Sequence, residues 1–339
     1  MTVLVTGGAG YIGSHMVHAL ADRGERVVVL DNLSTGFRKA IPDSVPLYVG
    51  DAGDQALAGS LLRKYSVRAV IHFAGSIVVP ESVANPLKYY LNNTGNSRSL
   101  IAAAVEAGVE NFIFSSTAAV YGNPASVPVS EDAPTAPVSP YGWSKLMTEV
   151  MLRDTGHAHG LRAVVLRYFN VAGADPKLRT GQSTPQATHL IKLAAQTALG
   201  LRPQLQLFGT DYPTRDGTCI RDYIHVSDLA RAHCAALDYL RSGGSSATFN
   251  CGYGHGFTVR EVIDAIERVS GRTLTVEVCG RRDGDPMSLV ADVRHIRSTL
   301  DWTPAYDDLD TIVAHALAWE LRLASGDGPK TAESSTAAA

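Results

Sequence analysis

A glycine-rich turn near the start of the chain constrains its fold more than any other feature. A short apolar run at residues 2–6 leads into GGAGYIG at 7–13, and an amphipathic stretch follows to about Arg23. Glycines allow a tight turn and a close ligand approach, and a helix N-terminus offers free N–H groups to an anion. The pattern alone also fits a plain strand-to-helix turn. In this context it predicts a dinucleotide-binding turn, with the expected contacts Gly7, Gly10, Tyr11, Ile12 and Gly13.

An acidic residue at the end of the second apolar run strengthens this interpretation. Asp31 lies about 20 residues past the glycines, where a carboxylate accepts a hydrogen bond from a ribose 2′-hydroxyl. The same charge would repel a 2′-phosphate, which favours NAD over NADP. Asp51 follows the third run and is either an adenine contact or an exposed turn residue. Their neighbours Asn32 and Ala52 are included among the expected cofactor contacts.

The apolar runs of the N-terminal half predict the fold class. TVLVT, RVVVLD, PLYVG, RAVIHFAG, NFIFSS and RAVVLRYFN alternate with longer amphipathic stretches. Continuous apolar runs are typical of strands buried on both faces, as in a parallel sheet covered by helices. We therefore expect a doubly wound parallel (Rossmann) sheet in an α/β domain at 1–170.

The C-terminal part has a looser pattern. We expect helices near 187–200, 227–241 and 258–270, and a strand at 247–251 that returns to the first sheet. Residues 171–323 would mainly form a smaller, loop-rich substrate domain. The segment 324–339 is too poor in apolar residues to offset the cost of ordering, so we expect it to be disordered.

Composition excludes several partner classes. The formal net charge is −3 and charges of both signs are scattered, which gives no reason to expect nucleic acid or a membrane surface. No run of about 18 apolar residues and no signal-peptide pattern occurs, so we expect a cytoplasmic protein. The four cysteines lie far apart and the histidines lack metal-ligand spacing, so we expect no metal site.

A tyrosine and a lysine four residues apart form the candidate catalytic pair. Tyr141 and Lys145 share a helical face if a helix begins near Pro140. An adjacent cation lowers a tyrosine pKa from about 10, which makes the phenol a usable general base. A solvated surface pair would have the same spacing. The apolar run at 111–117 ends in Ser115, Ser116 and Thr117, at the sheet edge where ligands bind, and Thr117 would hold the hydroxyl that Tyr141 deprotonates.

A hydroxyl, a tyrosine and a lysine behind an NAD turn resemble the extended short-chain dehydrogenase/reductase superfamily. Within it, the chain is similar to the UDP-glucose 4-epimerase family over almost all of residues 1–320. The motifs that carry this resemblance are VTGGAGYIGSH, VIHFAG, FIFSSTAAVYG, SPYGWSK, LRYFNVAGA, RDYIHVSDL and RRDGDP.

The resemblance implies residue roles. Tyr141 would handle the proton of the sugar 4′-hydroxyl, Lys145 would bind the nicotinamide ribose, and Thr117 would orient the sugar. Further cofactor contacts would be Phe73, Ala74, Gly75, Asn92, Ser115 and Tyr168. The UDP moiety would be held by Asn170, Arg221, Arg282 and Asp285. Each of the two arginines is alternatively part of a loop-fixing ion pair.

Two positions depart from the family pattern, and a third matches a position that bears on substrate size. Ile77 stands where some members have a lysine that touches the cofactor phosphates. His189 replaces a nucleotide-binding asparagine and is either a substrate contact or a surface helix residue. Leu289 matches a position that limits substrate size, and a leucine there predicts tolerance of UDP-N-acetylhexosamines.

The implied reaction interconverts UDP-glucose and UDP-galactose through a 4-keto sugar, with NAD as a catalytic group. A 4-epimerase of UDP-pentoses or UDP-uronic acids is the alternative, and a non-catalytic NAD-sensing protein is a remote one. A 4,6-dehydratase is disfavoured because Ala118 and Ala119 stand where it needs carboxylates. The family pairs helices near 85–108 and 140–160 across a dimer, so the resemblance also implies a homodimer.

Overall fold

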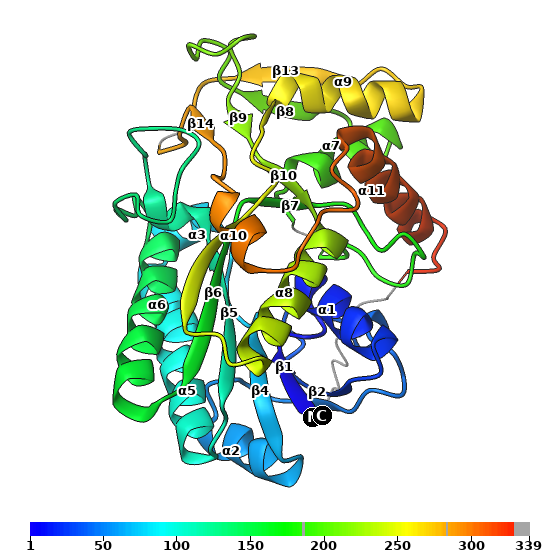
Figure 1. The fold of residues 1–339 in the computed structure, drawn as a ribbon. Helices are drawn as coiled ribbons and strands as arrows, with labels where there is room; N and C mark the ends of the chain where they lie inside the picture. The colour runs from blue at the N-terminus through cyan, green and yellow to red at the C-terminus, as the bar shows by residue number, and fades with distance from the viewer. Residues whose placement is uncertain (185–186, 283, 329–339) are drawn as a thin grey trace, which may run out of the picture.

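A parallel sheet of seven strands lies at the centre of the protein (Figure 1). The structure is a computed structural model and describes residues 1–184, 187–282 and 284–328. The sheet order is β11 (Ala247–Cys251), β6 (Arg162–Tyr168), β5 (Asn111–Thr117), β4 (Val67–His72), β1 (Thr2–Thr6), β2 (Arg26–Asp31) and β3 (Leu47–Val49). Strands β1 and β5 are buried along their whole length. The predicted doubly wound fold and the returning strand at 247–251 are confirmed.

Helices cover both faces of this sheet. Helices α1 (Tyr11–Asp22) and α8 (Val226–Arg241) pack together on one face, and α2 (Gln55–Lys64), α5 (Asn96–Glu106) and α6 (Pro140–His159) cover the other. The strand order reverses at β1, which pairs with β2 on one side and with β4 on the other. Ligands of doubly wound sheets bind beyond the carboxyl ends of the strands at such a reversal.

The helix expected near 85–108 is divided into pieces. Helix α3 (Val79–Ala84) is followed by α4 (Pro86–Tyr89), a π-helical turn η2 (Tyr90–Gly95) and α5. Single π turns inside helices are frequent at functional sites. Two short 3₁₀ turns, η1 (Arg38–Ala40) and η3 (Ala118–Tyr121), follow β2 and β5.

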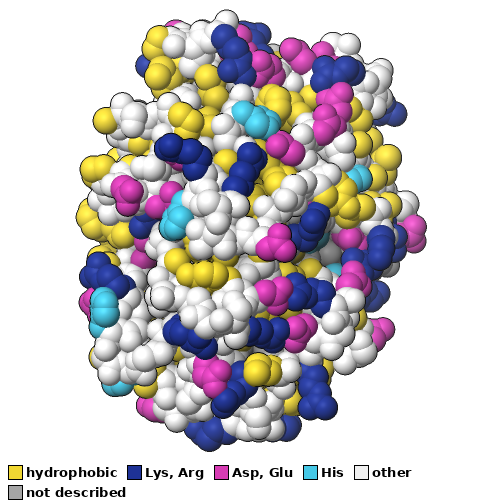
Figure 2. All heavy atoms as spheres, viewed as in Figure 1, with side chains coloured by type: hydrophobic (Ala, Val, Ile, Leu, Met, Phe, Trp, Pro, Cys, Tyr) yellow, Lys and Arg dark blue, Asp and Glu magenta, His cyan; other side chains and the backbone are white. Residues whose placement is uncertain are grey.

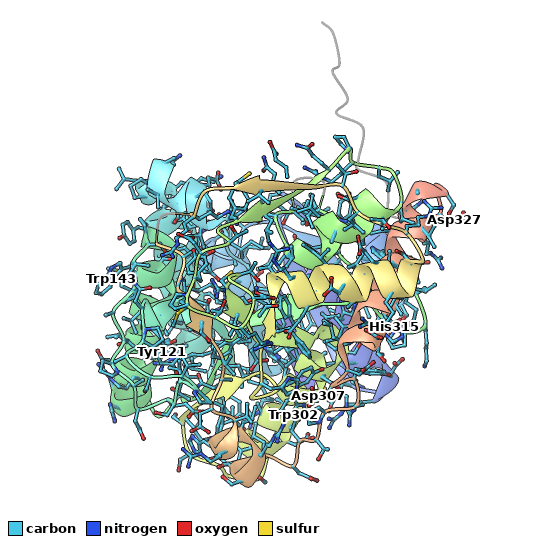
Figure 3. All side chains as sticks on the ribbon, turned by 90° about the horizontal axis from the view of Figure 1, so that it is seen from above. Tyr121, Trp143, Trp302, Asp307, His315 and Asp327 are labelled. Carbon is cyan, nitrogen blue, oxygen red and sulfur yellow. The ribbon has the colours of Figure 1, made fainter. Side chains whose placement is uncertain are left out.

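Short strands and helices form a second layer above the carboxyl edge of the sheet, and α9 lies across it when the molecule is seen from above (Figure 3). Its strand pairs are β7 (Asn170–Ala172) with β10 (Tyr223–His225), and β8 (Leu205–Phe208) with β13 (Val276–Cys279). A third small sheet joins β12 (Phe257–Thr258), β9 (Ile220–Arg221) and β14 (Ser288–Leu289). The helices are α7 (Leu190–Ala198), α9 (Val259–Ser270), α10 (Arg294–Thr299) and α11 (Leu309–Ala324).

The expected boundaries need one refinement. Helix α7 begins only after His189, so it is shorter than the helix predicted near 187–200. The division into domains at residue 170 stays a prediction. Ala324 ends α11, and residues 329–339 of the expected disordered tail lie outside the described residues.

The surface carries mixed charges. In the view of Figure 2, basic and acidic side chains alternate without a large region of one sign. Within the described ranges, no helix is both long enough and apolar enough to cross a bilayer.

Candidate active site

The glycine turn between β1 and α1 has the backbone geometry that a dinucleotide requires. Gly7 has a φ of +68°, and an added Cβ at Gly13 would lie 2.1 Å from the Gly7 carbonyl oxygen. Gly10 caps α1 without any side-chain hydrogen bond, and the first turn of the helix contains no acidic residue. The free N–H groups and positive end of α1 therefore stand open to a diphosphate. This bare glycine cradle fits NAD.

Two aspartates stand at the ends of β2 and β3, at the same edge of the sheet as this cradle. Asp31 ends β2, is 7% exposed, and accepts hydrogen bonds from the amides of Ala9 (2.9 Å) and Leu33 (2.8 Å). Burial raises its pKa, and the two backbone bonds oppose that shift. Asp51 accepts from the Gly53 amide at 2.7 Å, which fixes the turn after β3. Its turn role is thus observed, and its adenine contact stays a prediction.

Asn32 and Ala52 lie beside these aspartates. Asn32 donates to Asp51 at 3.4 Å, and Asn96 of α5 donates to the same carboxylate at 2.8 Å. Ala52 is buried. The ends of β2 and β3 and the start of α5 are therefore tied together around one expected ligand position.

The other expected cofactor residues lie along the same sheet edge. The backbone of Phe73 and Ala74, after β4, comes so close to Gly7 that a Cβ there would lie 2.6 Å from the Ala74 nitrogen. The hydroxyls of Ser115 and Tyr168, on neighbouring strands, share a hydrogen bond. Tyr11 also donates to the Gly173 carbonyl (2.7 Å). The sequence-predicted contacts from β1, β4, β5 and β6 are thus brought together.

The loop after β4 is held by a residue that sequence reasoning missed. Asn93, in the π turn η2, accepts from the Ser76 amide (2.7 Å) and donates to the Ser76 carbonyl (2.9 Å) and the Ser144 hydroxyl (3.0 Å). Its neighbour Asn92, an expected cofactor contact, donates to the Ser76 hydroxyl (2.9 Å). Adjacent asparagines at 92–93, in a stretch of otherwise helical pattern, were the available signal. Ile77, where some relatives have lysine, is 52% exposed.

Tyr141 and Lys145 lie on the first turns of α6, where the sequence predicted them. Ser139 caps this helix by accepting from the Gly142 amide at 3.2 Å, and Pro140 is its first residue. Thr117, the last residue of β5, lies close enough to the Tyr141 hydroxyl to lower the pKa of the phenol. A hydroxyl and a phenol therefore meet at the carboxyl edge of the sheet.

Lys145 is buried beside the same strand. It is 3% exposed, its Nζ donates to the Ser115 carbonyl (2.9 Å), and it lies 5.0 Å from the centre of the Phe114 ring. An added Cβ at Gly75 would be 3.7 Å from this Nζ. The Lys145 ammonium thus lies beside Gly75, another expected cofactor contact. Its contact with the nicotinamide ribose stays a prediction.

The pKa values differ from the simple expectation. Burial lowers the pKa of Lys145 to about 8, and the negative charge of Glu149 opposes this shift. Burial raises the pKa of Tyr141, and the neighbouring Thr117 side chain opposes this shift. The net pKa of Tyr141 is therefore raised, against the predicted lowering, because desolvation of the phenol outweighs the opposing effects. That Lys145 favours the phenolate stays a prediction.

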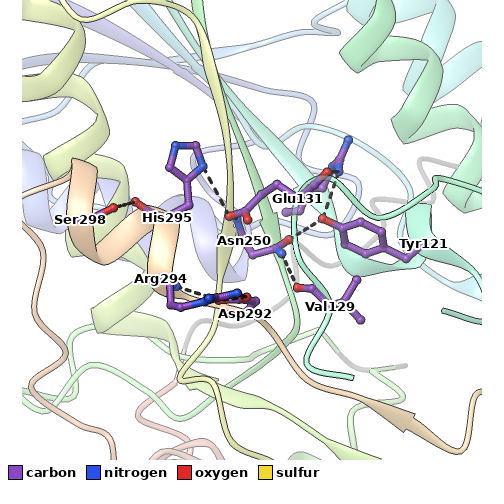
Figure 4. Close-up of polar contacts among 9 residues, drawn as sticks. Tyr121, Val129, Glu131, Asn250, Asp292, Arg294, His295 and Ser298 are labelled. Atoms are coloured by element: carbon purple, nitrogen blue, oxygen red, sulfur yellow. Dashed lines mark hydrogen bonds and ion pairs between the residues drawn. The ribbon is translucent and has the colours of Figure 1, made fainter. Parts of the chain in front are cut away.

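A buried network of ionic and hydrogen-bonding contacts connects α6 with β5, β6 and β11. Glu149 on α6 forms an ion pair with Arg167 of β6 (2.6 Å) and accepts from Ser116. Arg167 also donates to the Tyr121 hydroxyl (3.0 Å), which donates to Asn250 of β11 (2.7 Å). Figure 4 shows the outer part of this network, where Asn250 donates to the Val129 carbonyl and accepts from Tyr121. The network fixes α6 relative to β5 and thereby Tyr141 relative to Thr117.

The expected UDP residues come from the upper layer. Arg221 of β9 is 8% exposed and pairs with Asp285, while Leu289 of β14 stands opposite Arg221 in the parallel pair. The Arg282 guanidinium lies 3.8 Å from the centre of the Phe208 ring. Of the two interpretations of Arg221, the ion pair is observed, and contact with UDP stays a prediction.

Asn170 and His189 line one cavity of about 30 Å³ together with Tyr11 and Tyr223. His189 is the N-terminal cap residue of α7, and its Nδ1 lies 3.3 Å from the Gln182 side-chain nitrogen. Burial lowers its pKa, and the nearby Lys192 charge adds to the shift. His189 is only partly buried and immediately precedes α7, so both interpretations of this residue, substrate contact and surface helix residue, stay open.

Ala118 and Ala119, directly after Thr117, belong to the turn η3. In the described part of the chain, no group of three or more histidine, cysteine or carboxylate side chains is arranged to hold a metal ion.

A glycine turn, an acid after the second strand and a tyrosine–lysine pair on one sheet edge define an NAD-dependent enzyme of the short-chain dehydrogenase/reductase type. Comparison with known proteins narrows the class. Residues 3–252 match the model of the "NAD dependent epimerase/dehydratase family", and the chain belongs to this family.

The similar proteins carry one activity in their names. A UDP-glucose 4-epimerase of Azospirillum brasilense is 61% identical over 96% of this chain and 94% of its own length. The crystal structure of the Brucella ovis UDP-glucose 4-epimerase in complex with NAD is 46% identical, covers 94% of this chain and 97% of that chain, and has a TM-score of 0.91. The Campylobacter jejuni UDP-Glc/GlcNAc 4-epimerase is 49% identical, with coverages of 95% and 99% and a TM-score of 0.84.

Proposed function

We propose that this protein interconverts UDP-glucose and UDP-galactose by transient oxidation at C4 of the sugar. The observation that carries the proposal is the buried Tyr141 on α6, with Thr117 beside its hydroxyl and the buried Lys145 one turn further along the helix. This trio stands at the edge of a sheet whose glycine turn fits NAD. The names of the relatives support the same reaction.

The residues would divide the work as follows. When bound, NAD supplies a reversible acceptor for the hydrogen at C4. Tyr141 takes the proton of the 4′-hydroxyl and later returns it, and Thr117 orients that hydroxyl. Lys145 holds the nicotinamide ribose and favours the ionised form of Tyr141. Asn170, Arg221, Arg282 and Asp285 anchor UDP while the ketone turns over, because guanidinium groups suit a diphosphate.

The direct test is turnover without added cofactor. Purified protein incubated with UDP-galactose should produce UDP-glucose, resolved by chromatography, and Tyr141→Phe should lose about 10³-fold in kcat while it retains its NAD. Tyr239→Phe is the matched control, since Tyr239 packs against Phe249 away from the site. Unchanged turnover in Tyr141→Phe would remove the proposed base. No turnover by the wild type, even with added NAD, would favour the NAD-sensing alternative.

The substrate range follows from Leu289. At the matching position, family members that exclude N-acetyl sugars have a large tyrosine. Leucine is smaller and cannot make the polar contact of tyrosine, so UDP-N-acetylglucosamine should be accepted as well as UDP-glucose. The same assay with UDP-xylose and a UDP-uronic acid tests the alternative substrates. A protein that acts on one of these and not on UDP-galactose would belong to the pentose or uronic acid branch.

A homodimer is also proposed. Apolar side chains of α3, η2 and α6 are exposed, among them Val83 (63%), Leu91 (69%) and Trp143 (43%), and Figure 3 shows Trp143 at the outer edge of the molecule. Contiguous exposed apolar residues mark association surfaces. Light scattering coupled to gel filtration should give twice the chain mass. A cytoplasmic location stays a prediction.

A further inference from the structure

The C-terminal helix α11 reaches the wall of the nucleotide-sugar site through a buried ion pair. Lys192 of α7 and Glu320 of α11 are 6% and 3% exposed and contact each other directly. A buried pair of this kind is weak evidence for stability, because desolvation offsets much of the attraction between the charges. The burial of Lys192 and Glu320 at this position is therefore better explained by a role other than stability.

Each partner of the pair also binds a second group. The Lys192 Nζ donates to the main-chain carbonyl of Gln182 at 2.6 Å. Glu320 accepts a second hydrogen bond from Gln196, one turn further along α7, at 3.0 Å. Lys192 thus connects α11 to Gln182, and Glu320 fixes the direction in which Lys192 points.

Gln182 in turn contacts His189 through its side chain. The Gln182 side-chain amide lies 3.3 Å from the His189 Nδ1 and so restricts the orientation of the ring. The second ring nitrogen is then held in one direction. Without Gln182, other ring orientations become available.

The same residues enclose the cavity beside the expected substrate contacts. Gln182, His189 and Trp319 line it with Asn170. The Gln182 side-chain oxygen and the Trp319 Nε1 are buried and have no partner in the described part of the chain. Trp319 also lies flat against Gly181, where an added Cβ would be 2.4 Å from the indole ring. Helix α11 therefore holds this wall at Gly181 and at Lys192.

We propose that Lys192 and Glu320 are positioning residues for nucleotide-sugar binding: they fix Gln182, and through it the orientation of the His189 ring, in the wall of the site. This inference rests on the proposed function, because it assigns His189 to the UDP-sugar. Neither residue touches the reacting atoms, so the effect should fall on binding and leave the chemical step unchanged.

The test measures UDP affinity by calorimetry, together with kcat, KM for UDP-galactose, retained NAD and Tm. Lys192→Met should weaken UDP binding and raise KM about tenfold, as expected for one lost oriented hydrogen bond, with kcat and NAD content unchanged. It should also lower Tm, because Glu320 is left as an unpaired buried charge. Glu25→Gln is the control for destabilisation alone: it breaks the half-buried pair with Arg241 and should leave UDP affinity unchanged.

The double variant Lys192→Met/Glu320→Met separates positioning from stability. It removes both buried charges, so Tm should recover while UDP affinity stays weak. UDP affinity that follows Tm, or that is unchanged in both variants, would overturn the inference. Should Lys192→Met fail to fold, Gln182→Ala should weaken UDP binding to a similar extent, and normal binding by that variant would overturn the inference too. A wild-type protein that does not epimerise UDP-galactose would instead refute the proposed function.

Discussion

The two sides of the candidate site are built from different kinds of structure. On the cofactor side, Asp31, Ser115 and Tyr168 stand at the ends of long parallel strands, and the turn at residues 7–13 offers bare backbone. On the substrate side, Arg221 and Leu289 lie on strands of two residues each. The cofactor side is therefore fixed by the backbone of one sheet, and the substrate side by individual side-chain contacts.

This difference has a consequence for tolerance to change. A glycine turn packed against other backbone leaves no room for even a methyl group. The added methyl group would have to displace atoms of packed strands. Side-chain contacts on short elements are replaced one at a time, with effects near those of single hydrogen bonds. We expect substitutions on the cofactor side to abolish function and those on the substrate side to adjust it.

The largest effect is expected for Gly13→Ala. The added Cβ would lie 2.1 Å from the Gly7 carbonyl oxygen, so the turn must open. Retained NAD, measured after denaturation, should fall below about a tenth of the wild-type content, and activity should fall with it. Gly280→Ala is the matched control, since no atom lies within 4 Å of its added Cβ. Normal NAD content in Gly13→Ala would contradict the backbone account.

Lys145→Met should lower kcat about 10²-fold and change its pH dependence. A positive Lys145 favours the phenolate of Tyr141, so its removal raises the pKa of Tyr141 and moves the rising limb of kcat to higher pH. In the wild type this benefit should fade as pH rises through about 8, the pKa to which burial lowers that of Lys145. Rates from pH 6 to 10 measure both effects. Coincident rising limbs would show that Lys145 does not assist Tyr141.

Arg282→Leu should raise KM for UDP-galactose about tenfold with little change in kcat, because a diphosphate contact made throughout the reaction contributes to binding alone. The adjacent Arg281 is the control. It pairs with Asp211 (2.8 Å), and Arg281→Leu should change KM less than about twofold. Equal effects of the two substitutions would indicate that Arg282 acts only through general positive charge.

The smallest effect on UDP-galactose turnover is expected for Leu289→Tyr. The larger side chain should reduce the rate with UDP-N-acetylglucosamine about tenfold or more, while the rate with UDP-galactose changes less than about threefold. The ratio of kcat/KM for the two substrates is the quantity to measure. An unchanged ratio would remove Leu289 as a determinant of substrate size.

The same contrast explains what the sequence could predict. The sheet, the glycine turn and Asp31 follow from periodicity and from a motif with fixed local geometry. Tyr141 and Lys145 follow from helical spacing. The π turn at Asn92 and Asn93 had no periodic signal, because it depends on contacts between η2 and α6.

The residues of the substrate side were predicted only from the resemblance to the UDP-glucose 4-epimerase family. Neither the pairing of Arg221 with Asp285 nor that of Lys192 with Glu320 has a local signal, since each joins residues far apart in the chain. The predicted direction of the Tyr141 pKa shift was wrong, because residue spacing shows a neighbouring cation but does not show how deeply the phenol is buried.

The central claim is that one site removes the hydrogen at C4 and returns it. The most direct test uses UDP-galactose deuterated at C4 of the sugar, converted by the purified protein without added NAD, with mass and NMR analysis of the UDP-glucose formed. The account predicts that the product retains deuterium at C4, because the hydrogen never exchanges with water. Product with ordinary hydrogen at C4 would contradict transient oxidation within a closed site.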